Sequence, residues 1–454
     1  MADVAFVPLL WFFRKFLALK FGFVRFVQKS GSIFYAFTAA KCPRKWYNPD
    51  CHMLEYRTEA FLMEQLSQIL NELSPQLIDF ACRLVGTKSL TCQEQDVAAL
   101  VQTEMQQLGY DEVTVDAMGN VLGRIGSGEA ALLFDSHMDT VTVNDEAEWS
   151  FPAYGGELRD GNICGRGAAD MKCGLAASVY GAVAAKRAGL IAPGTAVYVS
   201  ASSMEEDYDG DALKYLLQQT GLRPKGVVLC EPTSLRIAVG HRGRSLIEIK
   251  MPGVSCHAST PEKGKNPVYL MQQIIARVQA LHESLCAQPG EHGSVALTNT
   301  YCTTASNNSV PQDATIILDR RLALGESEQI IGKEMDALVA GTDAQWCFCD
   351  IPARSWQGTP FVFHSFLPAW ELPADSPLAR GAVEACAQSG VQEPEVFKLG
   401  CSTNGVTSAG VFHLPSIVLG PGDLAYAHAR NEFCPADELV RACAIYARLC
   451  GKAL

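Results

Sequence analysis

The sequence predicts an α/β fold in which a smaller α+β domain is inserted into a larger domain with a mixed sheet flanked by helices. Short apolar runs at 195–200 and 226–229 have the length and composition of buried parallel strands, and the Ala-rich stretch 174–188 is typical of a packed helix. Near His241 the pattern changes to strands and helices in the order of an antiparallel α+β layer. After about residue 365 the pattern of helices and buried strands returns. A chain of 454 residues is also longer than a usual single domain.

The expected elements follow along the chain, each from its apolar spacing or its turn residues. Apolar residues at helical spacing predict helices between about 55 and 108, and Asp160-Gly161 predicts the turn of a hairpin. The other expected strands are 113–121, 130–134, 245–251, 295–301, 314–318 and 416–419, and the other expected helices are 267–281, 328–339, 378–389 and 436–449. These elements divide the chain into an extension at 1–54, a larger domain formed by 55–240 and 366–454, and an insert at 241–365.

The composition excludes one class of partner and indicates a compartment. The formal net charge of −12 would repel a phosphate backbone, so we expect no nucleic acid partner. The 17 cysteines are an odd number, lack the paired spacing of zinc fingers and in part lie inside candidate site segments, as Cys164, Cys173 and Cys230 do. Such scattered cysteines in a long chain indicate reduced thiols, which are typical of a cytoplasmic protein.

The first 54 residues differ from the rest of the chain. The apolar run 4–13 precedes a basic, Phe-rich stretch, whereas a secretory signal carries its positive charges before the apolar run. The run is also far shorter than the ~20 residues that a membrane-spanning helix requires. We expect a dispensable extension, translated upstream of a start at Met53 or Met63. The alternative left open is a segment that lies on an anionic membrane surface, a contact that we do not favour.

Histidines and carboxylates recur where the predicted strands end. The pentapeptide Ser-His-Met-Asp-Thr (136–140) follows the apolar run 130–134, so it places an imidazole and a carboxylate at the carboxyl end of a strand, where α/β proteins build their sites. Further such residues close strands or open loops downstream: Asp170, Glu205, Glu206, Glu231 and His428. A pair of divalent metal ions is the best reason to collect two histidines and several carboxylates in this way.

The chemistry of zinc fits this set of residues. Zinc favours imidazole nitrogen and carboxylate oxygen, and paired ions roughly 3.5–4 Å apart need a carboxylate that bridges them. Two Zn²⁺ ions against three ligating carboxylates would leave a charge of about +1, which lowers the pKa of a water between the ions and attracts a carbonyl oxygen. A further carboxylate, not bound to metal, is then needed to accept the proton of that water. The residues thus predict a two-metal hydrolase site.

Five motifs together resemble one family of enzymes. They are Ser-His-Met-Asp-Thr (136–140), Gly-Arg-Gly-Ala-Ala-Asp-Met-Lys (165–172), Glu-Glu (205–206), Cys-Glu-Pro-Thr (230–233) and Ala-His-Ala-Arg-Asn-Glu (427–432). In their order and spacing, from about residue 60 to the end, the chain resembles the metallopeptidase family of acetylornithine deacetylase, succinyl-diaminopimelate desuccinylase, aminoacylase and glutamate carboxypeptidase. The resemblance implies a zinc-peptidase-like catalytic domain and, for the insert, a lid and dimerisation domain.

The resemblance also implies a role for each motif residue. The implied metal ligands are His137 and Glu231 for one zinc ion, Glu206 and His428 for the other, and Asp170 as the bridge between them. Asp139 would hold the imidazole of the first ligand in position, and Glu205 would be the general base and later the general acid. The peptide bond Asp170-Met171, which follows the bridging aspartate, is usually cis in this family.

The insert resembles the family's lid. Gly-Val-Ser-Cys-His-Ala-Ser-Thr-Pro (253–261) matches the family's Gly-x-x-x-His-Ala signature, which implies that His257 reaches an active site and stabilises the oxyanion. In related enzymes this histidine comes from the other subunit, so a homodimer formed through the lid is expected. Asn308 and Arg321 match the substrate-binding Asn-x-x-Pro and Asp-x-Arg elements. For Arg321 a structural pair with Asp319 is the alternative.

One loop departs from the family pattern. Where the family usually has a Gly-Gly-Thr-Ser-Asp type of loop for the substrate carboxylate, this chain has Gly-Cys-Ser-Thr-Asn-Gly (400–405). Ser402, Thr403 and Asn404 would still bind an anionic group of the substrate through hydroxyls and backbone donors. Together with Met-Glu-Glu-Asp-Tyr-Asp-Gly (204–210), this variant most resembles a bacterial subgroup described as selenium-metabolism-linked hydrolases.

The sequence therefore predicts a cytoplasmic hydrolase that cleaves the amide C–N bond of a small N-acyl amino acid-like substrate. Its expected cofactor is two Zn²⁺ ions, or Co²⁺ or Mn²⁺ in their place. Two alternatives stay open. One is a dipeptidase or aminopeptidase of the same family, which needs the same ligands and differs only in its pocket. The other is a non-catalytic metal-binding relative, which a missing ligand or base would favour.

Overall fold

The computed structural model describes residues 26–29, 32–35 and 49–452, and side chains from residue 62 onward. The chain forms two compact units, 1–60 and 61–454. In the first unit, β1 (Phe26–Lys29) pairs with β2 (Ser32–Tyr35) antiparallel. Most of the extension predicted at 1–54 lies outside the described residues, so its predicted role stays a prediction.

A mixed nine-stranded sheet forms the centre of the second unit. Its order is β18-β10-β20-β9-β5-β8-β4-β3, with β19 paired to β10. The bounds are β3 (Glu112–Val115), β4 (Val121–Gly126), β5 (Glu129–His137), β8 (Thr195–Ser202), β9 (Gly226–Leu229), β10 (Ile237–His241), β18 (Trp370–Glu371), β19 (Val396–Leu399) and β20 (Ser416–Val418). Strands β8, β5, β9 and β20 run parallel, as their apolar runs predict, and β4 pairs antiparallel with β8.

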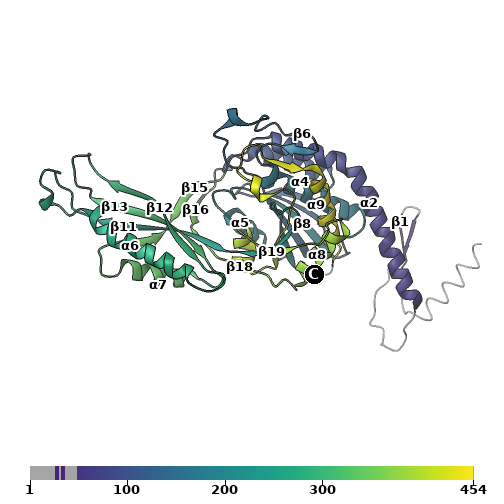
Figure 1. Cartoon of the computed structure of the whole chain (residues 1–454). Coiled ribbons are helices and arrows are strands. Elements are labelled where there is room, and N and C mark those ends of the chain that lie inside the picture. The colour runs from purple at the N-terminus through teal and green to yellow at the C-terminus, as the bar shows by residue number, and fades with distance from the viewer. Residues whose placement is uncertain (1–25, 30–31, 36–48, 453–454) are drawn as a thin grey trace, which may run out of the picture. The chain divides into compact units, whose positions relative to one another are not determined.

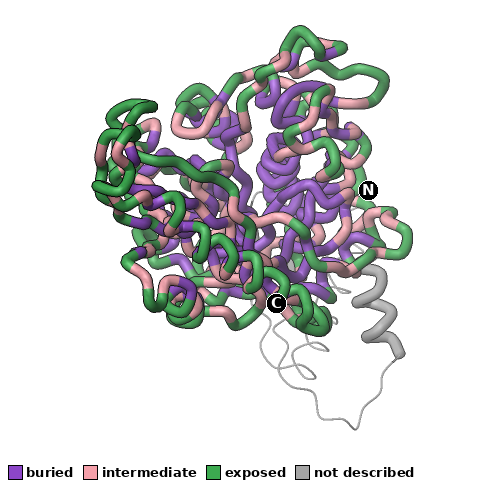
Figure 2. Tube along the Cα trace, turned by 60° about the vertical axis from the view of Figure 1, so that its left-hand side comes forward, coloured by how far each residue is buried: buried purple, intermediate pink, exposed green. Residues whose placement is uncertain are grey.

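Helices cover both faces of this sheet (Figure 1). They are α2 (Pro49–Gly86), α3 (Gln95–Gln107), α4 (Cys173–Arg187), α5 (Asp211–Thr220), α8 (Pro377–Gln388) and α9 (Ala436–Leu449). Leu132 and Phe134 of β5 pack with α4 and α9, whereas Leu133 packs with α5, because successive strand residues point to opposite faces. Every residue of α4 from Cys173 to Ala185 is buried, which explains its small side chains. The buried segments gather together in Figure 2, with exposed segments around them.

The insert forms a second, antiparallel sheet with its own core. The sheet has the order β12-β13-β11-β14, with β17 also paired to β11. The bounds are β11 (Gly243–Pro252), α6 (Pro267–Cys286), β12 (Ser294–Thr303), β13 (Asp313–Leu322), α7 (Glu328–Val339), β14 (Gln345–Phe348) and β17 (Phe366–Leu367). Residues of both helices and of the sheet share one hydrophobic cluster. The predicted α/β fold with an α+β insert is thus confirmed, although the numbered domain boundaries stay predictions.

Smaller elements complete the described chain. The hairpin predicted at Asp160-Gly161 is present as β6 (Glu157–Arg159) and β7 (Asn162–Cys164), and β21 (Phe433–Pro435) adds a third strand. A second hairpin is formed by β15 (Asp350–Arg354) and β16 (Pro360–His364). Short helical turns are η1 (Glu146–Glu148), η2 (Ala168–Lys172), η3 (Pro261–Lys263), η4 (Val406–Val411) and η5 (Leu424–Tyr426).

One predicted strand is divided in the structure. The prediction of a continuous strand over 113–121 is wrong, because β3 ends at Val115 and β4 begins at Val121. Between them the Asp116 carboxylate accepts hydrogen bonds from the backbone N–H groups of Met118, Gly119 and Asn120. An aspartate that bonds the backbone just after itself makes a turn, so two antiparallel strands replace one.

Two further findings concern membranes and thiols. Among the described helices, none combines the length and the apolar character that crossing a bilayer requires. Within the part of the chain whose side chains are described, the cysteines are free thiols.

Candidate metal centre

The predicted site residues come together because neighbouring parallel strands end at one edge of the sheet. Strand β5 lies between β8 and β9, and the three run parallel. Strand β5 ends at His137, Glu205 and Glu206 follow β8, and Glu231 follows β9. Asp170 lies in η2, immediately before α4. The fold therefore places four predicted ligands and the predicted base at one edge.

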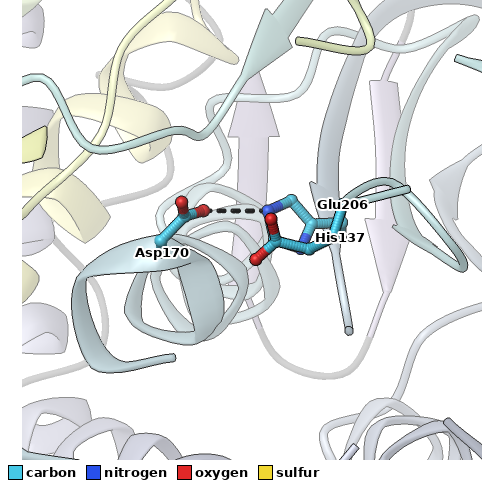
Figure 3. A group of neighbouring side chains, drawn as sticks. All are labelled: His137, Asp170 and Glu206. Atoms are coloured by element: carbon cyan, nitrogen blue, oxygen red, sulfur yellow. Dashed lines mark hydrogen bonds and ion pairs between the residues drawn. The ribbon is translucent and has the colours of Figure 1, made fainter. Parts of the chain in front are cut away.

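Asp170 lies between the two histidines. Its Oδ1 is 2.9 Å from His137 Nε2, and its Oδ2 is 3.5 Å from His428 Nε2. Glu206 Oε2 is 2.9 Å from His428 Nε2, and Glu231 Oε2 is 3.8 Å from His137 Nε2. The structure thus brings all five predicted ligands together, with one carboxylate facing both imidazoles. Figure 3 shows three of them, His137, Asp170 and Glu206, with the His137–Asp170 contact dashed.

Hydrogen bonds fix the orientation of His137. Its Nδ1 lies 3.0 Å from the carbonyl oxygen of Asp139 and 3.5 Å from the Oδ1 of the same residue. If Nδ1–H donates to this carbonyl, Nε2 is left free to bind a metal ion. The Asp139 carboxylate itself accepts the backbone N–H groups of Glu205 at 3.0 Å and Glu206 at 3.2 Å. Asp139 therefore holds the predicted base and two predicted ligands in one arrangement, and its backbone oxygen is the nearer partner of the imidazole.

The segment that carries Asp170 has an irregular backbone. Asp170 and Met171 have non-helical φ and ψ inside η2, and the peptide bond between them is cis, as the resemblance implies. The Glu432 carboxylate accepts the backbone N–H groups of Ala169 at 2.9 Å and Asp170 at 3.0 Å. These hydrogen bonds fix the position of the central carboxylate.

The electrostatics of the cluster fit divalent cations. Burial, together with the charges of neighbouring carboxylates, raises the pKa of Glu205, Glu206 and Glu231. The Oε1 atom of Glu206 is buried and has no hydrogen-bond partner among the described residues. Two groups of three side chains have ligand atoms within 4.8 Å of one another: His137, Asp170 and Glu206, and His137, Glu205 and Glu231. Buried carboxylates that repel one another, with an unpaired oxygen among them, are the donor set that a hard or borderline divalent ion requires.

Glu205 lies beside this cluster. Its side chain is largely buried, and its Oε2 is 3.9 Å from His137 Nε2. Glu205 is thus close enough to serve the site, and its role as the base instead of a ligand stays a prediction.

The loop 400–405 is held largely by its own side chains. Thr403 Oγ1 is 3.0 Å from His241 Nε2, and Asn404 bonds Asp135 at 2.8 Å and the backbone N–H of Gly210 at 2.7 Å. The hydroxyl of Ser402 is buried without a hydrogen-bond partner among the described residues. The substrate role of Ser402, Thr403 and Asn404 stays a prediction.

The structure places the predicted lid residues in the insert. A β-bridge pairs His257 with Ser309, and the backbone N–H of Ala258 donates to the carbonyl oxygen of Asn308 at 2.8 Å, so His257 and Asn308 are neighbours. The imidazole of His257 is exposed. Arg321 donates two hydrogen bonds to Asp319, at 2.8 and 3.2 Å, which is the structural pair left open as the alternative. Within the described chain, these side chains make no hydrogen bond or ion pair with the five predicted ligands, so their catalytic and substrate roles stay predictions.

Sequence reasoning missed three charged residues that lie buried at the site. Arg166 and Glu432 form an ion pair at 2.6 Å, with side chains 4% and 0% exposed. Lys172 is fully buried, its Nζ donates to the carbonyl oxygen of Thr87 at 2.7 Å, and burial lowers its pKa to about 7. All three lie inside the motifs 165–172 and 427–432, but charged residues are usually exposed, so spacing alone gave no signal of their burial.

A mixed sheet with histidines and carboxylates at its strand ends, joined to an antiparallel insert, defines the class of metallopeptidase-like hydrolases. Residues 133–452 match the sequence profile of the family described as Peptidase family M20/M25/M40. The chain belongs to this family, whose members are metal-dependent hydrolases.

Three similar proteins illustrate the relationship. The protein YgeY of Escherichia coli K12 is 35% identical over 370 residues, which cover 81% of this chain and 91% of YgeY. A succinyl-diaminopimelate desuccinylase of Dechloromonas aromatica is 25% identical and covers 83% of this chain and 98% of its own length. The crystal structure of Bacillus subtilis YXEP, described as a dinuclear metal binding peptidase, has a TM-score of 0.60 at 15% identity and covers 84% of this chain and 98% of YXEP. The last similarity concerns the fold alone.

Proposed function

We propose that this protein hydrolyses the amide C–N bond of a small N-acyl amino acid-like substrate with two divalent metal ions, zinc being the first choice. The single observation that supports this most is the position of Asp170, whose two oxygens face His137 at 2.9 Å and His428 at 3.5 Å. A carboxylate between two imidazoles is the arrangement that two neighbouring ions need. The relative named succinyl-diaminopimelate desuccinylase supports an acyl-amine substrate.

The ligands divide into two sets. His137 and Glu231 would hold one ion, Glu206 and His428 the other, with Asp170 shared between them. When bound, such a pair polarises a carbonyl group and lowers the pKa of water, and Zn²⁺, Co²⁺ and Mn²⁺ all have these properties. The description of YXEP as a dinuclear metal binding peptidase supports two ions.

Glu205 would move the proton. Its carboxylate, buried beside the ligands, would accept a proton from the attacking water and then donate it to the leaving nitrogen. The hydrogen bond from the Glu205 backbone to Asp139 would hold it in place for both steps.

The insert would complete the site. His257, exposed on the insert and 2.7 Å from Ser259 Oγ, would stabilise the oxyanion of the tetrahedral intermediate. Because related enzymes supply this histidine from a second subunit, we propose a homodimer formed through the insert. Asn308 and Arg321 of the insert would bind the substrate, together with the loop residues Ser402, Thr403 and Asn404.

The remaining expectations are part of the proposal. We infer a cytoplasmic protein whose partners are small molecules, not nucleic acids, and whose extension makes no membrane contact. The link to the subgroup of selenium-metabolism-linked hydrolases stays a prediction. A dipeptidase or aminopeptidase is the second candidate, which the description of YXEP as a peptidase favours, and a non-catalytic metal-binding relative is the third.

A substrate screen tests the proposal. Full-length protein loaded with Zn²⁺ would be assayed against N-acyl amino acids, dipeptides and ureido compounds, with the chelated protein as control. We expect metal-dependent release of the amine from at least one N-acyl amino acid. Hydrolysis of dipeptides alone would favour the peptidase. Binding of two zinc ions with no hydrolysis in any class would favour the non-catalytic relative.

A further inference from the structure

A buried ion pair lies directly behind the proposed metal ligands. Arg166 Nη1 lies 2.6 Å from Glu432 Oε2, and both side chains are almost completely buried. The guanidinium also lies 5.3 Å from the ring centroid of Trp149. The two residues are 266 positions apart in the sequence and meet where β7 pairs with β21.

The pair contacts the backbone of two proposed ligands at once. Glu432 Oε1 accepts the backbone N–H groups of Ala169 and Asp170, at 2.9 and 3.0 Å. Arg166 Nη2 donates to the carbonyl oxygen of His428 at 3.2 Å. One end of the pair therefore fixes the bridging aspartate, and the other end fixes the histidine proposed for the second ion.

The two proposed ions differ in how their ligands are supported. His137 closes β5 in the centre of the sheet, and Glu231 follows the neighbouring strand β9. His428, by contrast, follows the short turn η5 in a loop, and its side chain is 52% exposed. A ligand in an exposed loop needs a fixed backbone if it is to stay at binding distance.

We propose that Arg166 and Glu432 are positioning residues for the second ion, because together they set the separation of Asp170 and His428. This inference depends on the metal pair of the proposed function. According to this inference, the Arg166–Glu432 pair affects the affinity for the second zinc ion. The pair's own contribution to folding is a separate quantity, since buried ion pairs are often no more stabilising than well-packed neutral groups.

Two variants separate positioning from folding. Arg166→Lys keeps a cation for Glu432 but loses the guanidinium Nη2–H group, which donates to the His428 carbonyl oxygen. The double variant R166Q/E432Q removes both charges and keeps an amide oxygen for the N–H groups of Ala169 and Asp170. The matched control is Arg430→Met, which removes an exposed arginine that pairs with Asp145 and Glu148 two residues beyond His428.

The measurement is calorimetric titration of each full-length, metal-free protein with Zn²⁺, with bound zinc counted by mass spectrometry and folding checked by thermal melting. For both variants we expect the first zinc equivalent to bind as in the wild type and the second to bind about 10–100-fold more weakly. R430M should bind both equivalents normally.

Several results would overturn the inference. Unchanged affinity for the second zinc in Arg166→Lys would do so, as would equal weakening of both equivalents, which would indicate general support of the fold. Should R166Q/E432Q not fold, R166K alone decides. A wild type that binds two zinc ions but hydrolyses nothing would refute the proposed function, but the comparison of zinc affinities would still test this inference. A wild type that binds fewer than two zinc ions would refute the metal pair itself.

Discussion

At the scale of single residues, the site depends on carboxylates that are buried close to one another. Asp170 faces two imidazoles, Asp139 accepts the backbone N–H groups of Glu205 and Glu206, and Glu432 accepts that of Asp170. Because Glu205, Glu206 and Asp170 donate from their backbone N–H groups, their side-chain carboxylates remain available to the cluster. Burial raises the pKa of Glu205 and Glu206 there, and a bound cation would favour their charged forms.

The base assignment makes the first prediction. Replacing Glu205 by Gln keeps the size of the side chain but removes the proton acceptor, so kcat should fall by about 10²–10⁴-fold. Bound zinc should stay at two per chain, because Glu205 is not one of the proposed ligands. The matched control is Asp207→Asn, an exposed acid two residues away, which should leave kcat unchanged. Substantial residual turnover in E205Q would remove the base assignment.

His241 gives a prediction about stability and pH. Its Nε2 accepts a hydrogen bond from Trp370 at 2.8 Å, and burial lowers its pKa to about 4, below the value of about 6.5 in an unfolded chain. Between these two values the unfolded state binds more protons than the folded state. The contribution of His241 to stability is therefore complete above pH ~6.5 and is lost as the pH falls toward ~4, in total about 3 kcal/mol.

The check on His241 is urea denaturation of the wild type and H241Q across this pH range. Other groups also titrate there, so the difference between the two proteins is the relevant quantity. The wild type should lose more stability than H241Q between pH ~6.5 and ~4.5, and parallel curves would contradict the prediction.

At the scale of elements, the site is formed where strand ends and helix starts approach closely. Gly174, in the first turn of α4, lies against the end of β9: a Cβ atom there would be 2.1 Å from the carbonyl oxygen of Cys230, which precedes the proposed ligand Glu231. Helix and strand can come this close only because residue 174 has no side chain.

Gly174→Ala should therefore destabilise the fold by about 1–3 kcal/mol and weaken zinc binding, since backbone must move next to Glu231. The matched control is Gly332→Ala in α7, where the nearest atom, in the Trp346 ring, is 3.5 Å from the added Cβ. That change should be neutral or stabilising by up to ~1 kcal/mol, because alanine favours helices. Thermal melting and zinc titration measure both effects, and a G174A protein as stable as the wild type would refute the packing argument.

The elements also show which parts of the structure a sequence can predict. Buried strands such as β8 and β9 and the helices α4 and α9 are predicted correctly, because apolar spacing follows directly from burial on a face. The break between β3 and β4 is not, because it depends on the turn that Asp116 makes with its own backbone. The irregular turn η2 leaves no periodic signal either.

The site, like the fold, has parts that the sequence predicts and parts that it does not. Residue type and position after strands point to His137, Glu206 and Glu231, and the motifs shared with the family add Asp170 and His428; the structure brings all five together. The pair of Arg166 and Glu432 joins positions 266 residues apart, so no local pattern indicates it. The engagement of Thr403 with His241 and of Asn404 with Asp135 likewise depends on long-range packing.

At the scale of the whole molecule, every proposed ligand and the insert lie in the unit 61–454. Among the residues whose side chains are described, the hydrophobic core of this unit begins with Met63 and Leu66 in α2. The unit therefore contains what the proposed chemistry requires.

A chain beginning at Met53 should accordingly fold, melt within a few degrees of the full-length protein and bind two zinc ions. Melting curves and metal analysis of the two purified forms provide the check. A shortened chain that aggregates or loses zinc would show that the first 52 residues are needed for the fold.

The central claim is a pair of metal ions held by five side chains from separate parts of the chain. Its most direct test is anomalous diffraction at the zinc edge from crystals of the zinc-loaded protein. Two peaks roughly 3.5–4 Å apart are expected, one beside His137 and Glu231, the other beside Glu206 and His428, with Asp170 between them. A single peak, or peaks away from these residues, would contradict the claim.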